Sequence, residues 1–299
     1  MKPNRNFSLG AGVWTDDTSM MLALARSLGT YSGSARGVLR WYQNGVLSAI
    51  GRCFDIGSTI RRALGIYKDA LKASGALSPA ETRRLSPAAK EKEKEKRRTT
   101  AKSALARIAR DLRGDGFNRN GSLMRVLPVG LAYARDPAGA AAYARRSSAT
   151  THPNAVCKAA CAAWTECIAR LVRSADAREE AKGAEQISKL DVLHHFAAYP
   201  WPADADALRV ALAADVPLPA GAGALLTANM GDDADTVAAV YGGLAGVWYA
   251  VQEEGADGEE GLFWSPRVRA WRDALVRRDL IEEVAGELVE FVERHAASS

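Results

Sequence analysis

Apolar residues recur every three or four positions in several long segments of this 299-residue chain. This spacing is typical of helices that bury one face, and the period-two alternation of half-buried strands is scarce. The clearest helical segments are residues 20–28, 38–50, 155–172, 236–251 and 268–295. The sequence therefore predicts an all-α fold.

Composition adds few constraints to this prediction. Hydrophobic residues make up 47% of the chain and charged residues 25%, as in an ordinary soluble globular protein. No repeat of fixed period and no shift in composition separates two domains, so we expect a compact single-domain helical bundle over 1–299. No apolar stretch approaches the roughly 20 residues that cross a bilayer, and the first residues lack the apolar core of a secretory signal. We therefore expect no membrane span and a cytoplasmic location.

The net charge of +5 is concentrated in one segment. Residues 78–113 hold twelve Lys or Arg and five Asp or Glu, so the rest of the chain is slightly acidic. The Lys-Glu alternation at 90–96 has low complexity and no aromatic ring on which a base would stack, so a nucleic-acid partner is not expected. We interpret 72–113 as a charged insertion: a solvated helix, a mobile segment, or a docking surface for an acidic partner.

Three of the four cysteines lie within eleven positions, which raises the question of a zinc site. Cys157 and Cys161 are four residues apart in a helical pattern, however, and no Cys-x-x-Cys pair occurs. Cys53 and Cys167 complete the set. We expect all four to be buried free thiols, which fits a reducing compartment.

Two acidic segments stand at the starts of predicted helices, near the two ends of the chain. Their oxygen-bearing residues are Thr15, Asp16, Asp17, Asp232, Asp233, Asp235 and Thr236. Either segment alone fits a helix N-cap. Adjacent carboxylates repel, however, and are normally neutralised by a positive group, most often a hard cation with oxygen ligands. The pair therefore predicts a metal site shared by two distant segments.

Three further motifs lie between the acidic segments: Cys53-Phe54-Asp55-Ile56-Gly57, Asn120-Gly121-Ser122-Leu123-Met124-Arg125 and Thr151-His152-Pro153. Together the five motifs resemble the ADP-ribosylglycohydrolase family, with the closest likeness to the dinitrogenase reductase-activating glycohydrolase branch. The resemblance implies an all-helical domain holding two divalent cations, usually Mg²⁺ or Mn²⁺. It also implies hydrolysis of the N-glycosidic bond between ADP-ribose and a modified protein side chain, often arginine, with ADP-ribose as the product.

The resemblance also assigns roles to the acidic residues. The implied metal ligands are Thr15, Asp16, Asp17, Asp233, Asp235 and Thr236. Asp232 is expected either to support the ligands without contacting the metal or to cap the helix. Asp55 resembles the family's active-site aspartate, so we expect it to act as the acid/base or substrate-positioning residue alongside Asp16 and Asp17, although a capping aspartate is the plain alternative. Cys53 has no obvious histidine partner and is expected to pack rather than attack.

The remaining motifs suit an anionic ligand. The loop Asn120, Gly121 and Ser122 precedes an apolar run and is suited to present backbone N–H groups to an anion, although a simple turn is the alternative. The resemblance favours diphosphate binding by this loop and by His152, with Gly57 allowing close approach. Arg119 stands where the family usually carries a glycine.

One departure from the family pattern defines the alternative function. Family members typically carry an N-terminal helix and a glutamate that reaches the active site, whereas this chain begins fourteen residues before Thr15. The alternative is thus a catalytically impaired ADP-ribose-binding module. A His-Asp phosphohydrolase and a Walker-type nucleotidase are disfavoured, because neither a His-Asp dipeptide nor a Gly-x-x-x-x-Gly-Lys motif occurs. We expect a metal-dependent hydrolase of ADP-ribosylarginine.

Overall fold

The computed structural model describes residues 8–28, 34–77, 79–180, 187–203, 233–250 and 266–296. No β-strand occurs within these ranges, which confirms the all-α prediction. The elements in chain order are α1 (Asp16–Leu28), α2 (Ser34–Asn44), α3 (Ser58–Ala73), α4 (Pro79–Arg83), α5 (Pro87–Asp111), η1 (Asp115–Phe117), α6 (Leu127–Ala132), α7 (Pro137–Ala149), α8 (Ala155–Glu180), α9 (Lys189–Ala197), α12 (Ala234–Ala250), α13 (Pro266–Asp273) and α14 (Arg278–Ala296).

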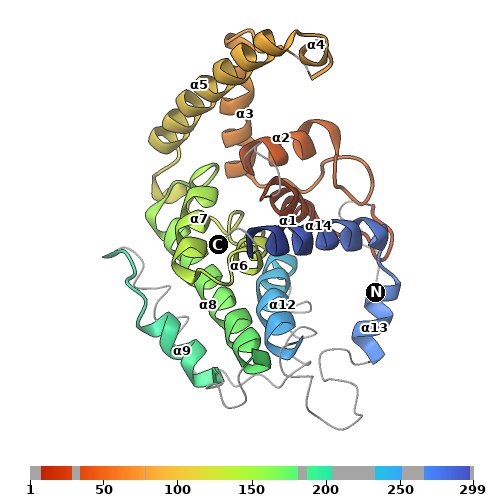
Figure 1. Ribbon diagram of the computed structural model, residues 1–299, viewed down its shortest axis with the longest axis vertical. Helices are drawn as coiled ribbons and strands as arrows, with labels where there is room; N and C mark the ends of the chain where they lie inside the picture. Colours follow the sequence, from red (N-terminus) through yellow and green to blue (C-terminus); the bar gives the residue numbers. More distant parts are fainter. Residues whose placement is uncertain are drawn as a thin grey trace.

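Helix α1 lies at the centre of the arrangement (Figure 1). It packs against α2, α6, α12 and α14, so most of its residues are buried on every side. Met20 and Leu24 in its middle are fully buried. A helix enclosed in this way holds its first turn firmly in place, and that turn carries Asp16 and Asp17.

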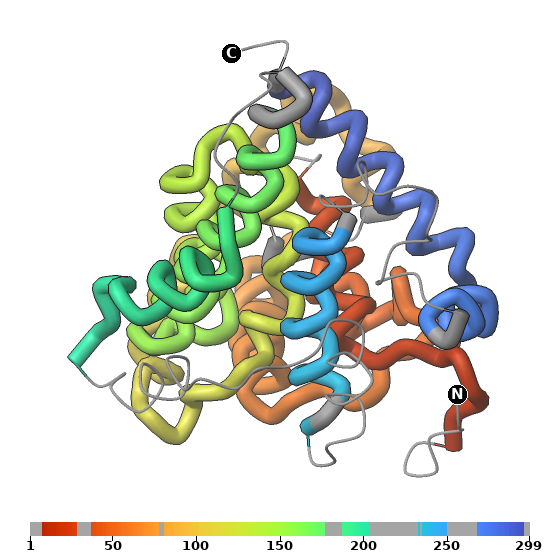
Figure 2. Tube along the Cα trace, turned by 90° about the horizontal axis from the view of Figure 1, so that it is seen from below, coloured from red at the N-terminus to blue at the C-terminus, as the bar shows by residue number. Residues whose placement is uncertain are grey.

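The largest apolar cluster joins α6 and α8 to α1 and α14. Helices α8 and α12 run close together (Figure 1 and Figure 2), and the two helices are in contact. Helices α6 and α8 approach closely at Gly130, where an added Cβ atom would lie 2.7 Å from Cγ2 of Ile168. The glycine therefore sets the spacing of two helices that support the pocket described below.

The charged segment forms α4 and α5, which with the end of α3 extend away from the main body (Figure 1). Ile108 and Ala104 of α5 are buried, and Ile108 packs against α3 with Ala63 and Ile66. Further towards its start the helix is mostly exposed, apart from Glu93, which accepts a hydrogen bond from the Leu77 backbone N–H at 2.9 Å. The helical interpretation of this segment is confirmed.

Of the predicted helical segments, one ends early and another is divided into two helices. The segment 38–50 is helical only to Asn44, because Gly45 adopts a left-handed φ of 62° and turns the chain. The segment 268–295 is divided into α13 and α14. Between them Val276 N–H donates to the carbonyl of Gly12 at 2.9 Å, and Arg277 has a φ of 53°, so a tertiary contact interrupts the helical pattern.

Three of the four cysteines are buried, as the sequence predicts. Cys157, Cys161 and Cys167 are buried free thiols, whereas Cys53 is only partly buried. Among the described helices, none combines the length and hydropathy needed to cross a bilayer. The cytoplasmic location and the reducing compartment stay predictions.

The close approach at Gly130 generates a stability prediction. Gly130→Ala should lower the free energy of unfolding by about 1–3 kcal/mol, because its methyl group overlaps Ile168 in a packed core. Gly65→Ala in α3 is the matched control, since an added Cβ there meets nothing within 4 Å. It should raise the free energy of unfolding by about 0.5–1 kcal/mol through helix propensity. Urea denaturation of both variants makes the comparison; equal stability of the two would refute the close approach.

Candidate active site

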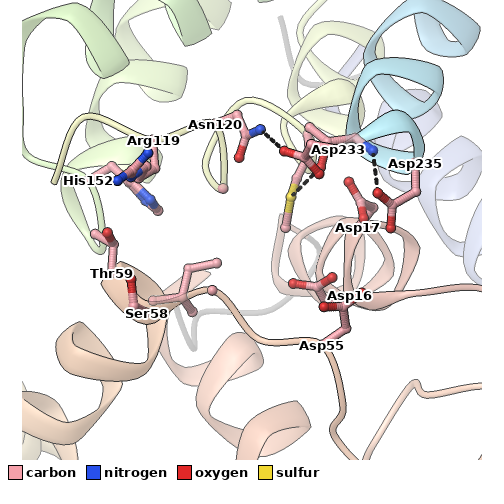
Figure 3. Close-up of a pocket in the computed structure, with 15 residues that line it drawn as sticks. Asp16, Asp17, Asp55, Ser58, Thr59, Arg119, Asn120, His152, Asp233 and Asp235 are labelled. Atoms are coloured by element: carbon pink, nitrogen blue, oxygen red, sulfur yellow. Dashed lines mark hydrogen bonds between the residues drawn. The ribbon is translucent and has the colours of Figure 1, made fainter. Parts of the chain in front are cut away.

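A pocket of about 250 Å³ opens where α1, α3 and α12 meet the loop before α6. Figure 3 shows its lining, in which acidic side chains gather at one end. Every site residue predicted from the sequence lines it except Thr15 and Ser122. The lining residues are Asp16, Asp17, Asp55, Gly57, Ser58, Thr59, Ile60, Arg119, Asn120, Gly121, Met124, His152, Asp233, Asp235 and Thr236.

The first turn of α1 supplies the deepest acidic residues. Asp16 is 6% exposed and Asp17 is 3% exposed. The Thr15 hydroxyl donates to Oδ2 of Asp17 at 2.8 Å, so Thr15 acts on the pocket through Asp17. The other oxygen of Asp17, Oδ1, is buried and has no hydrogen-bond partner among the described residues. A buried carboxylate oxygen without a partner is costly and marks a position suited to a bound group.

The start of α12 supplies the second acidic set. Asn120 donates from Nδ2 to Oδ2 of Asp233. Asp235 accepts from the Thr236 backbone N–H at 3.1 Å, and the buried Thr236 hydroxyl faces the sulfur of Met124 at 3.8 Å. Because α1 and α12 are in contact, two segments about 220 residues apart in sequence meet here, as the paired motif predicts. Asp232 lies outside the described residues.

Asp55 reaches the pocket from the loop before α3. Its φ of 51° is left-handed, a conformation that few residues other than glycine adopt, although aspartate tolerates it better than most. Burial, followed by the charges of Asp235 and Asp233, raises the pKa of Asp55 above its ordinary value. A strained backbone at a pocket wall is consistent with a functional position.

The acidic end carries strong mutual repulsion. Burial raises the pKa of Asp16 to about 9, with further contributions from Asp17, Asp55 and Asp235. Burial also raises the pKa of Asp17 to about 6, against the hydrogen bond from Thr15. No Lys or Arg among the described residues forms an ion pair with Asp16, Asp17 or Asp55. This end of the pocket therefore favours binding of a cation.

The donor chemistry fits a hard cation. Most side-chain donors at this end are carboxylate or hydroxyl oxygens, which Mg²⁺ and Mn²⁺ prefer, and Oδ1 of Asp17 lacks a partner among the described residues. Within the described ranges, however, no three His, Cys, Asp or Glu side chains converge closely enough to enclose an ion by themselves. An ion here would share its coordination sphere with water or with substrate oxygens.

The opposite end of the pocket is suited to an anion. Figure 3 shows Arg119 and His152 together, across from Ser58 and Thr59. Ser58 begins α3, and the N-cap residue Gly57 offers no side-chain cap, so the first N–H groups of the helix are available to a ligand. Unpaired N–H groups at a helix start favour negative charge.

Gly121 and His152 shape this end. An added Cβ at Gly121 would lie 2.8 Å from Cδ1 of Ile60 and 3.0 Å from Cε1 of His152, so a larger residue there would require both side chains to shift. Burial, followed by the charge of Arg125, lowers the pKa of His152 to about 3, which keeps its ring neutral. The Cys157 thiol donates to the Arg119 carbonyl at 3.3 Å and holds the loop against α8.

Comparisons with known proteins decide the family. The sequence model of a family described as ADP-ribosylglycohydrolase matches residues 2–297. The chain belongs to the ADP-ribosylglycohydrolase family. A solved structure titled as an ADP-ribosylglycohydrolase-related protein complex superposes with a TM-score of 0.58 and 27% identity, covering 98% of this chain and 86% of that one.

Two curated relatives are similar over a short part of the chain. ADP-ribosylarginine hydrolase Tri1 of Pseudomonas putida (strain GB-1) is 49% identical over 63 residues, which are 19% of this chain and 17% of the relative. Tri1 of Serratia proteamaculans (strain 568) is 48% identical over 69 residues, 20% and 18% of the two chains. The matches thus span less than a fifth of either relative. The likeness to the dinitrogenase reductase-activating branch stays a prediction.

Some residues that line the pocket were missed in the sequence, and two predicted site residues, Thr15 and Ser122, do not line it. Ser122 does not line the pocket; it is buried and its hydroxyl lies 2.9 Å from that of Ser148. Ser58 and Thr59 were missed, although a glycine followed by Ser-Thr at a helix start was the available signal.

Cys53 is unsuited to nucleophilic attack. Burial and the nearby charge of Asp16 raise the pKa of its thiol to about 11, so the thiolate is scarce at neutral pH. This agrees with the packing role expected from the sequence.

The raised pKa of Asp16 predicts how pH affects the stability of the metal-free protein. The pKa of Asp16 is about 9 in the folded state against an ordinary 3.8, so the unfolded chain releases this proton first as pH rises. The wild type should therefore lose stability between pH 4 and pH 9, and Asp16→Asn should escape this part of the loss. In chelator at pH 8, urea denaturation should find Asp16→Asn more stable than the wild type, with a smaller difference at pH 5.

Asp273→Asn is the control for this prediction, because its carboxylate is exposed and pairs with Arg278. Its effect should stay within about 0.5 kcal/mol at both pH values. If the wild type is at least as stable as Asp16→Asn in chelator at pH 8, the pKa of Asp16 in the folded protein is not raised.

Proposed function

We propose that this protein is a metal-dependent hydrolase that cleaves the N-glycosidic bond of ADP-ribosylated arginine in proteins and releases ADP-ribose. The observation that carries the proposal is the opposite character of the two pocket ends, one acidic and one suited to anions. ADP-ribose has a diphosphate next to the ribose whose anomeric carbon bears the scissile bond, so it matches this polarity. The names of the two curated relatives support arginine as the acceptor.

The acidic end would hold two divalent cations, Mg²⁺ or Mn²⁺. Its residues Asp16, Asp17, Asp233 and Asp235, with the hydroxyls of Thr15 and Thr236, are the expected ligands. Held by these residues, such cations would supply a more acidic water and would orient the ribose hydroxyls. The carboxylates also lower the free energy of positive charge at the sugar, which develops as the glycosidic bond breaks.

Asp55 is the proposed acid/base residue. Its raised pKa brings proton exchange closer to neutral pH than for an ordinary aspartate, which suits transfer to and from water. It would take a proton from the attacking water or hold the leaving guanidine in place. The left-handed backbone at Asp55 fixes the direction from which its carboxylate enters the pocket.

The other end would bind the diphosphate. Arg119 supplies positive charge, the first turn of α3 supplies N–H groups, and Gly121 lets the backbone approach closely. Binding the diphosphate there would turn the ribose towards the carboxylates.

The substitution Arg119→Gly introduces the residue that is usual in the family and tests this site. It should weaken ADP-ribose binding but leave adenosine binding unchanged, as measured by isothermal titration calorimetry. Equal affinity of wild type and Arg119→Gly for ADP-ribose would remove Arg119 from the diphosphate site.

One observation favours a second candidate, an ADP-ribose-binding module without hydrolysis. No three acidic, His or Cys side chains among the described residues enclose an ion unaided. If water and substrate oxygens did not complete the coordination, the pocket would bind ligand without activating water. Both candidates use the same diphosphate end. They differ in whether ADP-ribose is released from a modified protein.

The deciding experiment measures free ADP-ribose released from an arginine-ADP-ribosylated protein with Mg²⁺, with Mn²⁺ and with chelator. Release should require the cation. Asp55→Asn should lower kcat by about 10²–10⁴-fold, the usual range for loss of a general acid or base, while ADP-ribose binding is retained. Asp16→Asn and Asp235→Asn should also abolish release, and Asp273→Asn should not.

Each contrary result has a separate meaning. Release in chelator would contradict metal dependence. Tight ADP-ribose binding without release from any substrate would replace the hydrolase by the binding module. Faster release from a serine-linked substrate would overturn the arginine assignment and leave the hydrolase in place.

A further inference from the structure

Three buried side chains form a hydrogen-bonded row behind the pocket wall. Arg125, Thr151 and His152 are each only 1% exposed. Nη2 of Arg125 lies 2.9 Å from the Thr151 hydroxyl oxygen, and that oxygen lies 2.8 Å from Nδ1 of His152. The other contacts of the guanidinium are the Ser147 carbonyl at 3.5 Å and the Met20 sulfur at 3.8 Å. These hydrogen-bond partners are all neutral; burial lowers the pKa of Arg125 to about 10, and the charges of Cys161 and Asp16 act in the opposite direction.

The donor inventory fixes the direction of this row. A guanidinium has only donors, so the Thr151 oxygen must accept from Arg125. The hydroxyl has one proton, and among the described residues Nδ1 of His152 is the acceptor within reach. If Nδ1 carried a proton instead, the hydroxyl proton would be buried without an acceptor, which is costly. Nδ1 therefore accepts, and the ring proton sits on Nε2.

The second ring proton that would make His152 a cation is also disfavoured. Burial and the charge of Arg125 act together against the charged ring and lower its pKa to about 3. Nε2 lies on the opposite side of the ring from Nδ1, and His152 lines the pocket. No described residue bonds to Nε2, which would lie 3.3 Å from a Cβ added at Gly121. The Nε2–H group is therefore available to a ligand oxygen.

We propose that Arg125 is a positioning residue that acts through Thr151 to hold His152 in the neutral Nε2–H form, so that His152 donates a hydrogen bond to a ligand oxygen. The identity of the ligand rests on the proposed function, in which the oxygen belongs to the diphosphate. The opposite tautomer would present a lone pair to that oxygen and repel it. Arg125 thus influences ligand binding without contacting the ligand.

A second row fixes the backbone of the same histidine. The Ser148 hydroxyl donates to the His152 carbonyl at 3.0 Å, and the Ser122 hydroxyl lies 2.9 Å from that of Ser148. The Cys161 thiol donates to Ser122 at 3.3 Å. Because the single hydroxyl proton of Ser148 is donated to the carbonyl, the Ser148 oxygen must accept a hydrogen bond from Ser122. The two rows hold both the backbone and the ring of His152, so the donor has a fixed place.

The test reads the tautomer directly by long-range proton–nitrogen NMR on protein with ¹⁵N-labelled histidine and no ligand. The chain has only four histidines, and His152→Gln identifies the signal of interest. The wild type should show Nε2 protonated, Nδ1 unprotonated and no titration from pH 5 to pH 8. Thr151→Val removes the hydroxyl at nearly constant shape and should give a mixed tautomer, whereas Thr151→Ser keeps the hydroxyl and should restore the wild-type form.

Binding of ADP-ribose should follow the tautomer. Thr151→Val should weaken it about tenfold, the effect of losing one hydrogen bond to a charged group, and Thr151→Ser should bind as the wild type does. Arg125→Met frees the hydroxyl to accept from Nδ1 and should shift His152 towards the Nδ1–H form. If Arg125→Met does not fold, the two Thr151 variants decide the question.

Three results would overturn the proposal: an Nδ1–H ring in the wild type, titration of His152 between pH 5 and pH 8, or identical spectra for Thr151→Val and Thr151→Ser. Because the spectra are recorded without ligand, they do not depend on the proposed function. Failure of every variant and of the wild type to bind ADP-ribose would instead refute the proposed function and leave the tautomer assignment intact.

Discussion

Burial of several carboxylates in one place, together with their mutual repulsion, is the constraint on which the acidic end of the pocket depends. The packed helix α1 holds Asp16 and Asp17 in its buried first turn, and α12 brings Asp235 close enough to raise the pKa of both. The packing of α1 against four helices stabilises this unfavourable placement of buried carboxylates, and a bound cation would lower its free energy. Arg119 and His152 lie at the other end of the pocket (Figure 3), so a diphosphate bound there, as we propose, would be kept apart from these acidic residues.

The sequence predicted the fold class and the central helices because their apolar spacing is regular, but a local turn ended one predicted helix early and a tertiary contact divided another. The end of α2 at Asn44 had a local signal, the Asn-Gly pair that commonly ends helices, and was overlooked. The break between α13 and α14 had none, because no glycine or proline occurs there. It depends on Val276 bonding to the carbonyl of Gly12, more than 260 residues away in sequence.

The candidate site was predictable where chemistry was written in motifs and unpredictable where packing decides. Paired acidic segments and a family resemblance located the acidic end, and nearly all of those residues line one pocket. Ser122 was predicted, with Asn120 and Gly121, in a loop that presents backbone N–H groups to an anion, yet it does not line the pocket and its hydroxyl lies against that of Ser148 in the core. The role of Arg125 depends on which donor meets which acceptor in the folded protein, and no sequence pattern indicates that Arg125 contacts Thr151 and Thr151 contacts the His152 ring.

The most direct test of this account is calorimetric titration of the chelator-treated protein with Mn²⁺ at pH 7.5, repeated in buffers with different ionisation enthalpies. Asp16 has a pKa of about 9 and is therefore mostly protonated at this pH before metal binds. The account predicts saturable binding that releases about one proton per chain, because a carboxylate ligand must be deprotonated. Asp16→Asn should abolish the proton release. Absence of saturable binding, or binding without proton release, would contradict the claim that a divalent cation neutralises the acidic end of the pocket.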